Sequence, residues 1–300
     1  MLKLDETALR GSIPPLITPF RDGAVDEAAY AGLVEFQVEN GSHGILVNGT
    51  TSEPSSLTLA ERNRLVDVAL EAAAGRIQVV AATGSQSYAE TAELTRHAAG
   101  RPGVDALLIV TPYYSRPPQR GILEYYRALN ELHDKPWMIY HIPGRAAVDV
   151  KVETVKEIDA ACPTFVGMKH ASLDLAFVSD VLAEVDEDLR IFVGLEELSF
   201  PMMAVGACGL MNAAGNLNPK PLAEMCEAVW AGDLFAARAL HRRLFEINKA
   251  IFWDVNPIPM KYMMKRLGIL PRNEHRLPLV PASPDLEKRL DAVLERAGMV

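Results

Sequence analysis

Short apolar runs alternate with longer amphipathic stretches along the first three quarters of the chain. The apolar runs contain almost no polar positions, as in Leu-Leu-Ile-Val at 107–110, and such runs are typical of parallel strands that are covered on both faces. Eight of them are expected to be strands, at residues 13–17, 44–48, 77–83, 106–111, 137–141, 165–169, 191–194 and 209–212. Eight strands with helices between them predict an α/β fold, a closed (β/α)8 barrel.

The helices of this pattern carry start and stop signals. Thr58 with Glu61, and Ser87 with Glu90, match the capping box, in which a hydroxyl and a carboxylate satisfy free amides of a helix's first turn. Left-handed C-terminal caps are expected at three glycines, namely Gly41, Gly75 and Gly100.

The alternation stops after the eighth strand. Four successive helices are expected there, at residues 219–230, 233–252, 257–267 and 284–297. One of them closes the barrel before the extra ones begin. The predicted organisation is therefore a catalytic barrel domain at residues 1–230 and a C-terminal helical region at 231–300.

The composition narrows the possible partners. The chain has 300 residues, a net charge of -9 and a pI near 5.3, which argues against nucleic acid, because its binding relies on basic side chains. The three cysteines, at 162, 208 and 226, form no Cys-x-x-Cys pair, so neither a disulfide framework nor a thiolate metal site is indicated. The N-terminus lacks the features of a secretory leader, and no apolar stretch has the length of a membrane span. We expect a cytoplasmic protein.

Reactive side chains gather at the predicted C-terminal ends of the strands, where barrels of this kind carry their active sites. Lys169 is the most informative, because it ends the apolar run 165–168, where removal from water disfavours a charged amine. A lysine at a strand end can be a snorkelling or ion-paired side chain. It can also be an amine of lowered pKa that forms a Schiff base with a carbonyl substrate. The position alone leaves both interpretations open.

Two tyrosines and an arginine are expected at the same mouth. Tyr140 and Tyr114 can each be an ordinary aromatic residue of the barrel rim. A phenol that is hydrogen-bonded to a hydroxyl such as that of Thr50 can also move protons at a carbonyl substrate. Arg145 follows a Pro-Gly turn and can hold a carboxylate through two hydrogen bonds. Together with Lys169, these residues favour imine chemistry.

The motifs resemble those of the dihydrodipicolinate synthase and N-acetylneuraminate lyase family of class I aldolases over nearly the whole chain. Five segments carry the resemblance: Gly49-Thr50-Thr51-Ser52-Glu53, Pro112-Tyr113-Tyr114, Tyr140 with Pro143 and Arg145, Gly167-x-Lys169, and Asn256-Pro257-Ile258-Pro259-Met260-Lys261. The resemblance implies a TIM barrel that uses no metal and no cofactor beyond a covalent Schiff base of pyruvate on Lys169. It also implies a homo-oligomer, expected to be a tetramer built as a dimer of dimers.

The resemblance also implies roles for individual residues. Lys169 would form an imine with pyruvate, which loses a methyl proton to give an enamine that adds to an aldehyde. Tyr140 would be the acid/base residue, and Thr50 would connect it to Tyr114, which in this family comes across a dimer interface. Substrate contacts would come from Thr51, on the pyruvate carboxylate, and from Gly49, Met211 and Arg145. In the synthase branch, the position of Arg145 receives the carboxylate of aspartate semialdehyde, so a synthase is the leading expectation.

Several positions depart from the synthase pattern. Ser52 stands where glycine is usual, His141 where asparagine is usual, and Leu195-Glu196-Glu197 where the pattern has two aspartates after glycine. These changes favour a reshaped pocket. They keep open a relative that cleaves or dehydrates a 2-keto-3-deoxy sugar acid, or another hydroxylated 2-keto acid, through the same imine. Pro54 replaces a small polar residue of the family's feedback lysine site, so inhibition by lysine is not expected.

Other classes of protein fit less well. The seven histidines form no His-x-x-x-His pair for a metal, and neither a Gly-x-Gly-x-x-Gly turn nor a P-loop ending occurs. Glu196 and Glu197 are adjacent, which is more typical of charges at a helix N-terminus than of a glycosidase. His170 is expected to point away from Lys169 as a structural residue. A catalytically silent keto-acid sensor would have little need for a converging amine and phenol.

Overall fold

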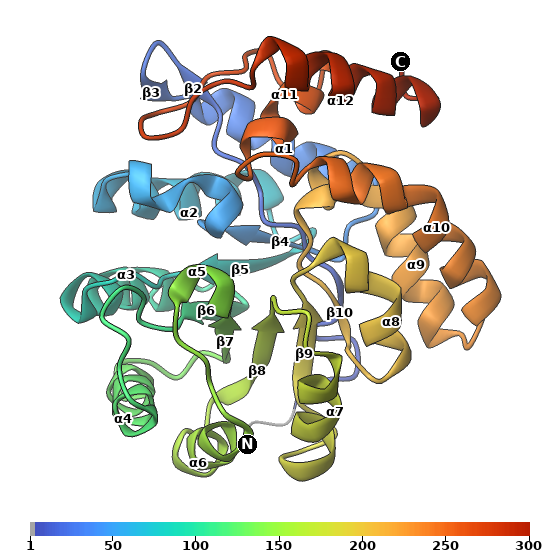
Figure 1. The fold of residues 1–300 in the computed structure, drawn as a ribbon. Helices are drawn as coiled ribbons and strands as arrows, with labels where there is room; N and C mark the ends of the chain where they lie inside the picture. The colour runs from blue at the N-terminus through green and yellow to red at the C-terminus, as the bar shows by residue number, and fades with distance from the viewer. Residues whose placement is uncertain (1–3) are drawn as a thin grey trace.

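The computed structural model describes residues 4–300; residues 1–3, part of the N-terminal segment considered above, lie outside the described residues. Eight parallel strands form one sheet in the order β1-β10-β9-β8-β7-β6-β5-β4. Their bounds are β1 Gly11–Ser12, β4 Gly44–Val47, β5 Gln78–Ala82, β6 Ala106–Val110, β7 Trp137–His141, β8 Phe165–His170, β9 Arg190–Val193 and β10 Gly209–Leu210. A parallel bridge between Pro15 and Leu46 closes the ring, so the predicted barrel is confirmed (Figure 1).

Helices surround the barrel and continue beyond it (Figure 1). The α-helices are α1 Glu27–Glu39, α2 Leu59–Ala73, α3 Tyr88–Ala99, α4 Gln119–Asn130, α5 Pro143–Ala146, α6 Val152–Ala161, α7 Leu175–Glu184, α8 Ser199–Ala204, α9 Pro219–Trp230, α10 Leu234–Ala250, α11 Ile258–Arg266 and α12 Pro284–Arg296. Loops contain the 3-10 helices η1 Thr50–Ser52, η2 Pro54–Ser56, η3 Glu196–Leu198 and η4 Ala213–Asn216, and a small hairpin of β2 Phe20–Arg21 and β3 Ala24–Val25. None of the helices described in residues 4–300 is long and apolar enough to cross a membrane.

The first strand, β1, ends just before the predicted segment 13–17 and is shorter, so the predicted bounds are wrong there. Pro14 and Pro15 have no backbone N–H to donate, so regular pairing is limited to β1. The segment still bonds to the neighbouring strand, because the N–H of Leu16 donates to the carbonyl of Leu46 over 3.0 Å and that of Leu46 to the carbonyl of Pro14 over 2.9 Å. The prolines thus shorten the strand without opening the barrel.

The two predicted capping boxes differ. At α2, Thr58 and Glu61 bond reciprocally to each other's backbone N–H, as expected. At α3, the Ser87 hydroxyl accepts from the Glu90 N–H. The Glu90 carboxylate does not reach back to Ser87, because it accepts from the Ser85 hydroxyl over 2.6 Å. Only one half of the second box is therefore present.

Two of the three predicted glycine caps have the expected conformation. Gly41 and Gly75 are left-handed, with φ of 75° and 72°. Gly100 has a φ of -70°, so the prediction is wrong there. Its N–H donates to the carbonyl of Arg96 as a continuation of the helix, which places no demand on glycine.

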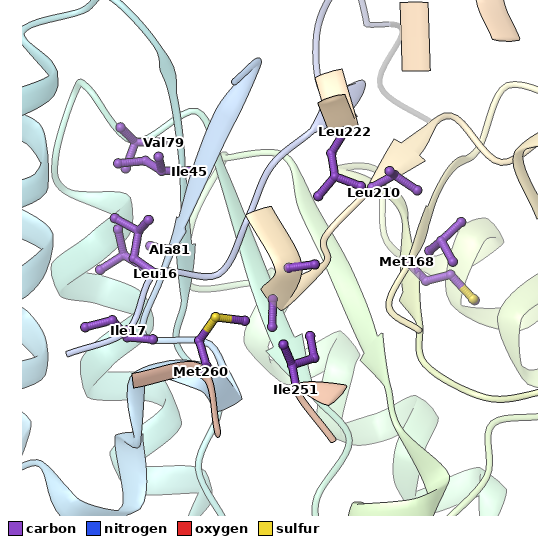
Figure 2. Packing of buried hydrophobic residues seen from close by; sticks show 14 of the residues in the cluster. Leu16, Ile17, Ile45, Val79, Ala81, Met168, Leu210, Leu222, Ile251 and Met260 are labelled. Atoms are coloured by element: carbon purple, nitrogen blue, oxygen red, sulfur yellow. The ribbon is translucent and has the colours of Figure 1, made fainter. Parts of the chain in front are cut away.

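Alternate residues of the barrel strands face two separate apolar layers. On β5, Val80 and Ala82 belong to the cluster inside the barrel, whereas Val79 and Ala81 belong to the cluster between barrel and helices (Figure 2). This arrangement explains the continuous apolar runs, because both faces of each strand are buried.

The C-terminal helices share the outer cluster. Ile251 and Met260 pack in it with Leu16 and Ile17 of the first barrel segment (Figure 2). The predicted boundary near residue 230 falls between α9 and α10 and stays a prediction. Residues 231–300 are packed onto the barrel through one continuous core.

Candidate active site

Lys169 and Tyr140 lie side by side at the C-terminal ends of two neighbouring strands. Tyr140 on β7 pairs in register with Lys169 on β8, so both side chains point into the barrel. The Lys169 ammonium lies 4.5 Å from the centre of the Tyr140 ring. Only 3% of Lys169 and 5% of Tyr140 is exposed. The amine and the phenol that the sequence singled out therefore converge in one buried place.

Thr50 reaches this pair from the loop after β4. Its Oγ1 lies 3.2 Å from the hydroxyl of Tyr140, within hydrogen-bonding distance. Gly49, just before it, passes close to the first barrel segment, since a Cβ there would lie 3.1 Å from the Cβ of Pro15 and 3.2 Å from Leu46 Cδ2. A larger residue would push the loop away from the strands, and with it the hydroxyl that Tyr140 contacts.

A cavity of about 580 Å³ opens beside these residues. Four of the predicted site residues line it, namely Gly49, Thr50, Tyr140 and Arg145. Arg145 is an exposed residue of the short helix α5. Arg62 also lines the cavity, and a concave site of this volume with two guanidinium groups suits a small anionic molecule.

Thr51 and Met211 are buried next to the cavity and do not form its wall. Thr51 Oγ1 accepts a hydrogen bond of 2.9 Å from the side-chain amide of Asn256. Met211 is fully buried in the inner cluster that also contains Tyr140. Lys169, like these two residues, does not line the cavity.

Tyr114 is not brought to the site within one chain. Its side chain is 89% exposed, and within residues 4–300 its hydroxyl has no hydrogen-bond partner. Its φ of 70° is a left-handed conformation that bulky residues rarely adopt. The structure of the single chain thus leaves the predicted contact between Thr50 and Tyr114 unmade and presents the phenol outward.

Two of the sequence departures for which we expected a reshaped pocket do not face the cavity. Ser52 is fully buried, and its hydroxyl donates to the carbonyl of Leu16 over 2.6 Å. His141 follows Tyr140 on β7 and therefore points to the opposite side of the strand, where its ring lies 5.0 Å from that of Phe177. Neither side chain lines the cavity.

On the outer side of β7 and β8, two histidines form a buried pair. Nδ1 of His141 lies 3.0 Å from Nδ1 of His170, and Nε2 of His141 lies 2.5 Å from a carboxylate oxygen of Asp149. The ring of His170 stacks on Phe177, and burial lowers the pKa of His170 to about 4. His170 thus points away from Lys169, as expected, and supports the strand from outside.

Glu196 and Glu197 both lie in the first turn of η3, as expected for residues at a helix start, but their surroundings differ. Glu197 is exposed and pairs with Lys249 over 3.4 Å. Glu196 is buried; one oxygen accepts from the Ala214 N–H over 3.2 Å, and the other has no hydrogen-bond partner among residues 4–300. Burial raises the pKa of Glu196 to about 7, although Lys169 opposes this. Nothing in the local sequence distinguishes the two glutamates.

A second buried pair joins two residues of the sequence motifs at 49–53 and 256–261, for which we predicted no role. Glu53 and Lys261 form an ion pair with side chains 0% and 1% exposed. The signal for Lys261 was a single lysine within the mostly apolar stretch 258–264. In the described residues, no three His, Cys, Asp or Glu side chains come together as a possible metal site.

A buried lysine against a tyrosine at the mouth of a (β/α)8 barrel defines the class of site that Schiff-base aldolases use. The sequence matches the model of the Dihydrodipicolinate synthetase family over residues 8–297. It is 45% identical over 292 residues to a 4-hydroxy-tetrahydrodipicolinate synthase of Thermus thermophilus, covering 97% of each chain. The chain belongs to the dihydrodipicolinate synthetase family.

Solved structures agree with this assignment. The fold is similar to the crystal structure of dihydrodipicolinate synthase from Aquifex aeolicus, with a TM-score of 0.94 and 38% identity, covering 97% of this chain and 98% of that one. It is also similar to the chloride-inhibited enzyme from Acinetobacter baumannii complexed with pyruvate, with a TM-score of 0.93 and 32% identity, covering 98% of this chain and all of that one. The family predicted from the motifs is confirmed.

Proposed function

We propose that the protein is a 4-hydroxy-tetrahydrodipicolinate synthase, a lyase of the class I aldolase type that condenses pyruvate with L-aspartate semialdehyde. The observation that most directly supports this function is the convergence of Lys169, Tyr140 and Thr50 beside the cavity. The 45% identity to a relative of that name supports the substrate pair. An amine packed against an aromatic ring, with a hydroxyl-bonded phenol next to it, has the parts that imine chemistry needs.

The first half of the reaction converts pyruvate into an enamine on Lys169. The neutral Lys169 amine adds to the keto carbon, and loss of water gives an iminium on Nζ. Tyr140, as phenolate, then takes a proton from the methyl group, and the electron pair moves toward nitrogen to give an enamine. Thr50 can exchange the phenol proton through the hydrogen bond of 3.2 Å. Thr51 holds the pyruvate carboxylate.

The second half joins the two substrates. The enamine carbon attacks the aldehyde carbon, and Tyr140 returns its proton to the aldehyde oxygen. The amine of the second substrate then displaces Lys169 from the iminium, which closes the ring and frees the enzyme. Arg145, at the exposed rim of the cavity, receives the carboxylate of the semialdehyde. Gly49 forms part of the adjoining wall, and Met211 packs behind it in the inner cluster that also contains Tyr140.

A second copy of the chain completes the proton path in this proposal. Tyr114 is held outward in a strained backbone conformation, which is consistent with insertion into a neighbouring subunit. It would then approach Thr50 of that subunit, in a dimer that pairs into a tetramer. The expected setting is the cytoplasm, without nucleic-acid or membrane partners.

Borohydride trapping tests the imine directly. Reduction in the presence of pyruvate should add the pyruvate-derived mass to the peptide that contains Lys169. Lys169→Ala should remain unlabelled, and Lys265→Ala, an exposed lysine, should be labelled like the parent. No label on the parent, or equal label on Lys169→Ala, would contradict the proposal.

A substrate panel separates the synthase from a 2-keto-3-deoxy sugar acid aldolase or dehydratase. Ser52 and His141 do not face the cavity, so two features that favoured the alternative lose their weight. We expect a higher specificity constant for aspartate semialdehyde than for other aldehydes or keto-deoxy acids. Arg145→Ala should weaken use of the semialdehyde and leave imine formation with pyruvate largely intact. Equal loss of both steps would argue against this role of Arg145.

A further inference from the structure

The pyruvate-binding turn is held by residues from the far end of the chain. The turn consists of η1, residues 50–52, and Glu53. The Asn256 amide donates to Thr51 over 2.9 Å, and both residues are largely buried. Lys261, on α11, forms the buried ion pair with Glu53. Two contacts therefore connect this turn to the C-terminal region.

We propose that segment 256–261 is a positioning element of the active site, in which Asn256 sets the direction of the Thr51 hydroxyl and Lys261 holds the turn through Glu53. The inference rests on the proposed imine with pyruvate. In this proposal the C-terminal region positions a pyruvate-binding residue in addition to contributing to the hydrophobic core.

The role of Asn256 follows from the direction of its hydrogen bond. Because the amide N–H occupies a lone pair of Thr51 Oγ1, the hydroxyl hydrogen must point elsewhere. A hydroxyl has one hydrogen to donate. With Asn256 as donor, that hydrogen is free for the carboxylate of pyruvate. An acceptor at position 256 would take the hydrogen itself and deprive the substrate of it.

The role of Lys261 follows from burial. Its ammonium also donates to the carbonyl of Glu274 over 2.9 Å and lies 4.3 Å from the centre of the Phe20 ring. Burial raises the pKa of Glu53 and lowers that of Lys261, whereas the attraction between the two opposes both shifts. Separating the two partners of a buried ion pair would leave two charges without compensation in the interior, which is strongly unfavourable. The pair therefore keeps Glu53 and Lys261 close together.

The backbone of the turn needs such an anchor. Glu53 has a φ of 57°, a left-handed conformation that residues other than glycine adopt at a cost. Two residues earlier in the chain comes Thr51. On the other side, α11 is fixed to the barrel, because Met260 packs in the outer cluster with Leu16 (Figure 2). Lys261 thus comes from a rigid helix and Asn256 from the turn just before it, which favours precise placement of the turn at residues 50–53.

Position 256 offers the sharper test. Asn256→Asp replaces the donor by an acceptor of the same shape, and Asn256→Ala removes the contact. We expect the pyruvate concentration for half-maximal borohydride trapping to rise about tenfold or more in Asn256→Asp, and less in Asn256→Ala. Asn63→Asp, on α2 outside the cavity, is the control and should match the parent. If Asn256→Asp also matches the parent, Thr51 donates to position 256 and the inference is wrong.

Position 261 tests the anchor and separates it from stability. Lys261→Met removes the Lys261 ammonium from Glu53, whose carboxylate keeps only the more distant His275, 3.9 Å away, as an ion-pair partner among residues 4–300. This variant should lower the urea midpoint of unfolding, whereas Glu53→Gln with Lys261→Met should recover part of it. Both variants should still need about tenfold more pyruvate for half-maximal trapping. Lys265→Met, exposed on the same helix, should behave like the parent. Normal trapping by the folded double variant would show a merely structural pair and overturn the anchor.

The two proposals can fail separately. A parent protein that pyruvate does not label overturns the proposed function, and this inference falls with it. A labelled parent whose variants at positions 256 and 261 trap pyruvate at the parent's concentrations overturns this inference alone.

Discussion

The buried carboxyl of Glu196 predicts a specific dependence of stability on pH. Its pKa is raised from 4.5 to about 7, first by burial and against the attraction of Lys169. Between these two values the folded protein binds more protons than the unfolded chain. Stability is therefore lost as the pH rises through this window. The perturbation that isolates the effect is Glu196→Gln, a neutral side chain of the same shape that can still accept from the Ala214 N–H.

The magnitude follows from the shift. A difference of about 2.5 pKa units corresponds to about 3 kcal/mol over the whole window, at about 1.4 kcal/mol per unit. Most of it, about 2.5 kcal/mol, falls between pH 5 and pH 8. Because other groups titrate in both proteins, the informative quantity is the free energy of unfolding of Glu196→Gln minus that of the parent.

Urea unfolding followed by tryptophan fluorescence, at one protein concentration and several pH values, measures this difference. We expect Glu196→Gln to gain about 2.5 kcal/mol relative to the parent between pH 5 and pH 8. Glu197→Gln is the matched control, because Glu197 is exposed and pairs with Lys249 at the surface; its profile should run parallel to the parent's. A parallel profile for Glu196→Gln as well would refute the reasoning.

Three further predictions concern turnover, folding and regulation. Tyr140→Phe should lower turnover about a hundredfold or more while borohydride trapping of pyruvate persists, because the ring stays and the proton carrier is lost; unchanged initial rates would contradict this. Gly167→Ala should fail to fold or unfold at much lower urea, since φ is 150° and a Cβ would lie 2.2 Å from the carbonyl oxygen of Arg190; circular dichroism of the soluble protein checks it. Free L-lysine at millimolar concentration should leave initial rates unchanged, because Pro54, which lines the cavity, stands where the family resemblance implies a small polar residue of the feedback lysine site; dose-dependent inhibition would count against it.

The barrel could be predicted because its signals are local. Apolar runs and capping residues lie close together in sequence, and α9 begins and ends at the predicted residues. The errors also have local causes. Prolines at 14 and 15 interrupt a strand that apolarity alone extends, and Gly100 continues its helix although glycine usually ends one.

The sequence predicts only those residues of the candidate site that lie at the ends of the barrel strands. Lys169 and Tyr140 both end apolar runs, and neighbouring parallel strands place such ends together. The orientation of His141 follows from alternation along β7, but its partners on β8 and in the loop at Asp149 do not. The different surroundings of Glu196 and Glu197 depend on Ala214 and Lys249, which no local pattern connects to them.

Of these contacts, those that hold Thr51 in place are the hardest to predict from the sequence. Asn256 is 205 residues away in sequence, and each residue taken alone is an ordinary polar side chain. Their relation depends on how α11 docks on the barrel, which hydrophobic residues such as Met260 decide. In the proposed arrangement, the same core that stabilises the C-terminal region therefore also determines which way the Thr51 hydroxyl points. Substitutions in that core should affect pyruvate binding before they unfold the protein, because a hydrogen bond is more sensitive to small displacements than apolar packing is.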